Sequence, residues 1–197
     1  MYNVSIGHSS LTANTTGEYN AAVGTTSLNK NTTGNYNSAF GSFSLYDNTT
    51  GAYNSAIGFL SLQNNTTGQF NTALGNNTLN NITTGSKNTS IGYSTSASSS
   101  AAINQTVIGY QADGQADNSV VLGNSDVTAI YMAEDSGATI YAGNATFNGD
   151  VVIQSDARLK SNIVSLGSTL PKLLQIDGKS YEMKGKQKIG VLAQDIQ

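Results

Sequence analysis

The chain has 197 residues, of which only 11% are charged, with 21 glycines, one proline and no cysteine. Asn, Thr and Ser fill polar positions where a helical protein would carry Glu, Lys and Ala, so the composition argues against a helical protein and favours a β or loop-rich fold. The lack of cysteine excludes a disulfide framework and a thiolate metal site, and no apolar run is long enough for a membrane span or a signal peptide.

The charge is distributed unevenly. Residues 1–154 carry two basic and eight acidic side chains, whereas residues 155–197 carry seven basic and four acidic ones, within a net charge of −3. This break in composition predicts a domain boundary near residue 155. The basic surplus of the tail is small and mixed in sign, so we expect no nucleic-acid partner.

A repeat organises the first part of the chain. The motif Asn-Thr-Thr-Gly-Xaa-Tyr-Asn-Xaa-Ala-Xaa-Gly occupies residues 31–41 and again 48–58. Its last residue, here called the closing glycine, recurs every 17 residues, and one further step of 14 residues reaches Gly123. A fixed period over more than half of a chain is typical of repeat architectures. The closing glycines are Gly7, Gly24, Gly41, Gly58, Gly75, Gly92 and Gly109.

Each copy alternates in the way a strand does. Tyr36 and Phe40 would face one side and Asn37 and Ala39 the other. The small residues of the second side suit a close neighbouring backbone. The Thr-Thr-Gly element predicts a turn in which glycine supplies a positive φ. A copy therefore fits one coil of a β-solenoid, with two short strands and two turns.

Stacking such coils at a spacing of roughly 4.8 Å would place equal residues in ladders. Rows of Asn can then bond amide to amide, and rows of aromatic residues can pack. The aromatic row is expected to be core or ladder packing, with a sugar-stacking surface as the alternative. Asn-Thr-Thr also fits the N-glycosylation pattern, although turn chemistry explains it better. The residues concerned are Tyr2, Tyr19, Tyr36, Tyr53 and Phe70 in the aromatic row, and Asn14, Asn31, Asn48 and Asn65 in the glycosylation pattern.

Residues 86–118 are less regular, and Ser94 to Ala102 reads as a Ser/Ala-rich insertion. The threonine pairs, such as Thr49-Thr50, leave a second hypothesis open: a monomeric solenoid that binds ice or another repetitive surface through its Thr rows.

The segments 54–58 (Asn-Ser-Ala-Ile-Gly) and 88–92 (Asn-Thr-Ser-Ile-Gly) resemble the head repeats of YadA-like trimeric autotransporter adhesins. The resemblance covers residues 1–124. It implies a left-handed parallel β-roll with three chains around one axis, and hence a homotrimer. The repeat is already running at Tyr2, so we expect the chain to be a fragment at its N-terminus.

Residues 125–154 are expected to form a β-rich neck or shaft. Val127 to Met132 and Ala138 to Tyr141 read as strands, and 146–153 reads as a hairpin around Asn148-Gly149.

The stretch from Ser155 to Ile163, together with Ile189 to Gln194, resembles the intramolecular chaperone domain of phage tail spikes and fibres, a self-cleaving peptidase family. The resemblance implies that residues 155–197 help a trimer assemble and are released by a cut between Gln154 and Ser155. Ser155 would be the nucleophile and Lys160 its general base. A Ser hydroxyl needs such a base, and a desolvated Lys can serve.

The spacing of the two residues limits this chemistry. Five residues on one helix rotate by about 500°, so Ser155 and Lys160 would point apart unless the segment is irregular or Lys160 comes from another protomer. Asp156 could orient Lys160 or cap a following helix, and a merely structural helix start is the competing reading. The family domain is normally much longer than 155–197, so we expect a truncated, inactive form here.

The sequence thus predicts an all-β, trimeric fibre segment followed by a short helix-containing tail. Its expected role is structural and adhesive, on a virion tail fibre or a bacterial surface, where it would contact a glycan or envelope component of a host or prey. We expect no cofactor and no metal, since His8 is alone and Asp113, Asp117 and Asp126 match no calcium loop.

Overall fold

The computed structural model describes residues 2–131 and the backbone of two strands at 179–183 and 186–190. The chain divides into two compact units, Met1–Ala138 and Thr139–Gln197. Each unit is considered by itself.

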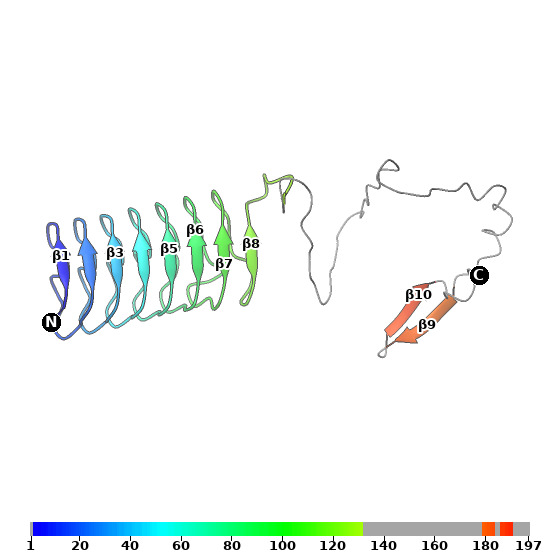
Figure 1. Cartoon of the computed structure of the whole chain (residues 1–197), viewed down its shortest axis with the longest axis horizontal. Helices are drawn as coiled ribbons and strands as arrows, with labels where there is room; N and C mark the ends of the chain where they lie inside the picture. The colour runs from blue at the N-terminus through cyan, green and yellow to red at the C-terminus, as the bar shows by residue number, and fades with distance from the viewer. Residues whose placement is uncertain (1, 132–178, 184–185, 191–197) are drawn as a thin grey trace, which may run out of the picture. The chain divides into compact units, whose positions relative to one another are not determined.

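The first unit is a parallel β-solenoid of about seven coils. Each coil adds one short strand to an eight-stranded sheet in which the strands follow one another in sequence order (Figure 1). The strands are β1 (Val4–Ile6), β2 (Ala21–Val23), β3 (Ser38–Phe40), β4 (Ser55–Ile57), β5 (Thr72–Leu74), β6 (Thr89–Ile91), β7 (Thr106–Ile108) and β8 (Val120–Leu122).

The register of the sheet places equal repeat positions side by side. Ala39 pairs with Ala56, and Phe40 pairs with Ile57. On the last step Ile108 pairs with Leu122, the position before Gly123. A repeated sequence in such a register makes every column of the sheet a ladder of similar side chains.

The expectation of two strands per coil is wrong, because each coil of the described part contributes one strand of three residues. In a typical coil, three residues outside the strand that are not glycine have a positive φ. Tyr36 (57°), Phe43 (58°) and Leu45 (50°) represent these three positions. These angles lie in the left-handed region and break any extended segment. The coils still exchange backbone bonds there, as Leu45 N–H donates to the Ser61 carbonyl at 3.0 Å.

The positive-φ glycine is also not where the sequence predicts it. The glycine of Thr-Thr-Gly does not have a φ in the left-handed region, whereas the closing glycines do, with Gly58 at 134°. The predicted close approach is confirmed at these positions. A Cβ added to Gly58 would lie 2.6 Å from the carbonyl carbon of Gly75, so no side chain fits between successive coils.

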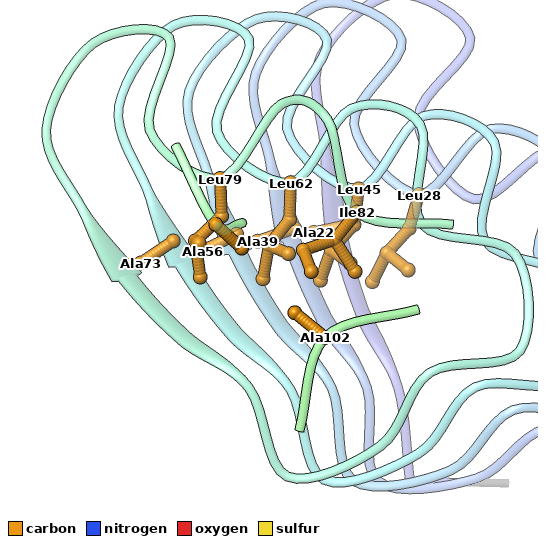
Figure 2. Packing of buried hydrophobic residues seen from close by; sticks show 11 residues of the cluster. Ala22, Leu28, Ala39, Leu45, Ala56, Leu62, Ala73, Leu79, Ile82 and Ala102 are labelled. Atoms are coloured by element: carbon orange, nitrogen blue, oxygen red, sulfur yellow. The ribbon is translucent and has the colours of Figure 1, made fainter. Parts of the chain in front are cut away.

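The predicted alternation is confirmed, since Tyr36 and Phe40 are exposed and Asn37 and Ala39 are buried. The hydrophobic core is a thin rod inside the coils. Alanines of the strands meet leucines that lie four residues after each closing glycine (Figure 2). The core includes Ala22, Ala39, Ala56 and Ala73 with Leu28, Leu45, Leu62 and Leu79.

Two buried asparagine ladders run beside this core, as predicted. In the first, the Asn54 amide donates to Asn37 Oδ1 at 3.1 Å and to the Gly68 carbonyl at 2.8 Å. In the second, Asn65 Nδ2 donates to Asn48 Oδ1 at 2.9 Å. That ladder ends at Asn65, whose Oδ1 has no partner, because Ile82 takes the next place. Burial of Asn48 and Asn65 excludes these two from glycosylation in the folded chain.

The reading of Ser94 to Ala102 as an insertion is wrong. Thr95, Ala97 and Ala102 are buried, and isolated bridges join Ser86 to Ile103 and Ser96 to Asp113. The stretch belongs to a coil of ordinary length, in which Ser and Ala residues replace the Asn-Thr-Thr-Gly turn.

The expected strand at Val127 to Met132 is not present in residues 127–131, which have no regular structure. The other neck strands, at 138–141 and 146–153, and the helix expected after Ser155 lie outside the described residues. In the second unit, β9 (Lys179–Met183) and β10 (Lys186–Gly190) form an antiparallel hairpin. No helix occurs among the residues whose structure is described.

Candidate functional site: the outer face of the parallel sheet

The outer face of the sheet carries a continuous row of aliphatic and aromatic side chains, which are exposed except for the half-buried Val23. They occupy the strand position just before each closing glycine, which points away from the core because the preceding residue points inward. Phe40, for example, is 42% exposed. This apolar row consists of Ile6, Val23, Phe40, Ile57, Leu74, Ile91, Ile108 and Leu122.

A second row, of aromatic rings, runs parallel to it. The rings of Tyr19 and Tyr36 stack with centroids 4.9 Å apart and an interplanar angle of 0°, and Tyr53 stacks on Phe70 at 5.1 Å. The expectation of ladder packing is confirmed, but this row does not belong to the core, since Tyr19 is 46% exposed. The aromatic row comprises Tyr2, Tyr19, Tyr36, Tyr53 and Phe70.

The backbone of the aromatic row is unusual. Tyr19, Tyr36, Tyr53 and Phe70 all have φ between 57° and 59°. A bulky residue in the left-handed region carries a strain of about 1 kcal/mol or more, and stacked rings recover a similar amount per pair. Ring stacking between coils therefore offsets a backbone strain that would be uncompensated in an isolated coil.

No strand from β1 to β8 contains a charged residue. Between the two rows lie small or β-branched side chains such as Ser38, Ser55 and Thr72. The two apolar rows form one continuous surface over several coils, unlike the scattered apolar residues of an ordinary surface. The aromatic row ends at Phe70, because exposed Lys87 takes its place in the next coil. Such a face can bind a partner by burying apolar area.

The two threonines of each Thr-Thr pair have different environments. The first hydroxyl bonds the next coil, as Thr49 Oγ1 donates to the Thr66 carbonyl at 3.1 Å. The second threonine of the pair, such as Thr50 or Thr67, is exposed. The solenoid therefore carries one exposed Thr column at this corner.

The residues that the sequence singles out for chemistry, Ser155 and Lys160, lie outside the described residues, as does the bond between Gln154 and Ser155. Across the described ranges, no three His, Cys, Asp or Glu side chains come together as metal ligands. Asp117 instead accepts from the Ile103 N–H at 2.8 Å. In the same ranges, no helix is long and apolar enough to cross a membrane.

The sequence reasoning missed any role for the outer face as a whole. It predicted core or ladder packing for the aromatic row, with a sugar-stacking surface as the alternative, and described the residue before the closing glycine only as apolar. The signal was available, because a position that is apolar in every copy and alternates with a buried alanine must point outward.

Comparison with known families gives one match. Residues 155–197 match the family model described as "Chaperone of endosialidase". This match supports the resemblance stated for the C-terminal part of the chain. Comparisons with curated proteins and with solved structures gave no match.

Proposed function

We propose that the chain is a trimeric segment of an extracellular fibre, built from three solenoids around one axis and assembled with the help of residues 155–197. The observation that carries the proposal is the outer face of the sheet, with its apolar row, its aromatic row and strands that contain no charged residue. Two identical copies would offer each chain the same linear rows at the same spacing. The left-handed roll implied by the YadA-like resemblance is part of this proposal.

The family match of residues 155–197 supports the proposal that the chain is assembled as part of a fibre. A domain described as the chaperone of an endosialidase belongs with a protein that must be assembled before it works. A parallel solenoid has a long folding path with repeated, nearly equal coils, so pairing in the wrong register is a real risk during assembly. We therefore assign the chain to a phage tail fibre or a related surface fibre that contacts a host or prey glycan.

The exposed Thr column favours a second candidate, a monomeric solenoid that binds ice or another regular lattice. Its Thr50 and Thr67 are exposed and repeat with the coils. This candidate requires that the apolar outer face stay uncovered, so the oligomeric state decides between the two.

The mass of the chain in solution tests the trimer. Light scattering after size exclusion is expected to give a mass near three times 20.4 kDa. Ile57→Asp would place one carboxylate per chain on the covered face and is expected to shift the mass toward that of one chain, whereas Thr50→Asp, on an exposed turn, leaves it unchanged. A wild-type mass near 20.4 kDa with a folded far-UV spectrum would refute the trimer and favour the Thr column.

Self-cleavage is tested in a form that carries a full-length chaperone domain. We expect this form to be cut between Gln154 and Ser155. The Ser155 hydroxyl would attack the Gln154 carbonyl as Lys160 takes its proton, the Ser155 nitrogen would leave carrying a proton, and water would then hydrolyse the resulting ester. Ser155→Ala is expected to stay as one uncut band on denaturing gels, and mass spectrometry would locate the new terminus. Bands of equal size for both forms would remove the peptidase role and leave the assembly role intact.

A further inference from the structure

The side of the solenoid formed by the loop after each closing glycine differs from the sheet face in one respect. Its inward residues repeat closely, as with Ser44 and Leu45, but its outward residues change from coil to coil. In two neighbouring coils the outward residues are aromatic. Phe43 and Tyr46 meet at 5.7 Å between ring centroids, and Phe43 meets the ring of Phe59 edge-on at 6.3 Å.

The coil itself does not need these rings. The residue 17 positions before Phe43 is Thr26, and the residue 17 positions after Phe59 is Asn76. Phe59 is 46% exposed, so its ring is not part of the core. Phe43 also has a φ of 58°, a region that Asn77 occupies in an equivalent loop at lower steric cost. Phe43 thus carries the steric cost of a left-handed φ, and Phe59 leaves a large apolar ring exposed, although equivalent loops do without either ring, which indicates a role outside the fold.

A polar hollow lies on the coil that begins with Phe59 and on the two coils that follow it. It has a volume of about 290 Å³ and is lined by Asn64, Asn77, Asn80, Asn81, Ser94 and Ser96. Only amides and hydroxyls therefore line it. The backbone connects it directly to the aromatic cluster, because the Asn77 N–H donates to the Phe59 carbonyl at 2.8 Å.

The amides of the hollow hold one another in place. Asn64 Nδ2 donates to Asn80 Oδ1 at 2.8 Å, Asn80 Nδ2 donates to Asn77 Oδ1 at 2.6 Å, and Asn77 Nδ2 donates to Ser94 Oγ at 3.2 Å. Each amide group has two N–H donors and two acceptor lone pairs, so this chain leaves capacity on every member. Donors and acceptors are thus fixed in direction and available to a ligand with hydroxyl groups.

The charges beside the rings cancel. Lys30 Nζ lies 2.7 Å from Asp47 Oδ1 and 4.8 Å from the centroid of the Tyr46 ring. The hydrogen bond and the charge of Asp47 raise the pKa of Lys30, which keeps the ammonium protonated and paired. No net charge is left to recruit an acidic ligand.

We propose that Phe43, Tyr46 and Phe59, together with the amide-lined hollow, form a binding site for a neutral saccharide. A pyranose has a face of weakly positive C–H groups, which packs on the negative face of an aromatic ring, and a rim of hydroxyls, which pairs with amides. Aromatic walls with a few fixed polar groups are the usual composition of small-ligand sites. The inference deepens the proposed function, since it supplies the glycan contact of the fibre, and it rests on that function for its biological meaning.

The test measures saccharide binding by saturation-transfer NMR on the intact chain. The probes are maltotetraose, cellotetraose and chitotetraose as neutral oligosaccharides and sialyllactose as an acidic one. Phe59→Asn and Phe43→Thr place at each position a residue that an equivalent loop already carries, so the fold is expected to survive. Tyr110→Asn is the matched control, because it removes an exposed ring from the position that Phe59 occupies, three coils further on.

We expect at least one neutral probe to bind, with an affinity that falls tenfold or more in Phe59→Asn and Phe43→Thr and stays within twofold in Tyr110→Asn. Neutral-probe binding that both loop variants retain would overturn the site while leaving the fibre's glycan contact in place. Binding of sialyllactose alone would overturn the neutral class. Wild-type chain that binds none of the probes would overturn this proposal, and the trimer would still be judged separately by its mass.

Discussion

Gly58→Ala is expected to destabilise the solenoid by about 3 kcal/mol, the sum of left-handed strain and forced separation of coils. Gly58 has a φ of 134°, and an added Cβ would lie 2.6 Å from the carbonyl carbon of Gly75 and closer still to its oxygen. The obstructing atoms belong to the backbone, so no side-chain rotation can relieve the clash. The coil would have to part from the following one, and the bond from Gly75 N–H to the Ile57 carbonyl, 2.8 Å long, would weaken with it.

Thermal unfolding followed by circular dichroism measures this effect, and a drop of about 10 °C is expected for a loss of that size. Thr50→Ala is the control, because Thr50 is exposed on a turn of the same coil and its loss should change stability by less than about 0.5 kcal/mol. Equal melting temperatures for Gly58→Ala and the wild type would mean that successive coils are not in the close contact described.

Asn54→Ala is expected to cost about 3 kcal/mol, because it removes three buried hydrogen bonds and leaves the Asn71 N–H without a partner. Asn54 is fully buried. Its amide donates to Asn37 Oδ1 and to the Gly68 carbonyl, and its Oδ1 accepts from the Asn71 N–H at 3.0 Å. Asn37 Oδ1 would keep the bond from the backbone N–H of residue 54, and the Gly68 carbonyl would keep the bond from Asn65 Nδ2, but the Asn71 N–H would stay buried and unpaired. Chemical denaturation would measure the loss, and Asn76→Ala, at an exposed position, should change stability by less than about 0.5 kcal/mol.

Asn54→Asp separates hydrogen bonding from shape. The new carboxyl group fits the same space but can donate to the Gly68 carbonyl only when it is protonated. Burial would raise its folded-state pKa above the unfolded value, so the protonated form is favoured in the folded chain and stability is lost as pH rises through that pKa. The deficit relative to wild type should therefore be smaller at pH 4 than at pH 8. A deficit that does not depend on pH would contradict the role given to the amide donor.

The sequence alone determined the repeat, the parallel stacking and the direction of most side chains. The fixed period requires coils that pair with their neighbours, and a period-two pattern around Ala39 separates buried from exposed residues. The asparagine rows also followed from the sequence, since equal residues in register must meet. The resemblance of the stretch beginning at Ser155 was carried by two short motifs and agrees with the family match of residues 155–197.

Tertiary structure alone decided which glycine takes the positive φ and how many strands a coil contains. It also decided which surface residues come together around the hollow beside Phe59. The closing glycine is forced into its conformation by the backbone of the next coil, which a local turn rule does not include. The repeat position of Tyr36 has a left-handed φ even where Lys87 and Asn104 replace the ring, so the geometry of the coil and not the aromatic stack sets this angle. The hollow beside Phe59 likewise gathers side chains from several coils, and only the folded stack brings Asn64, Asn80 and Ser94 together.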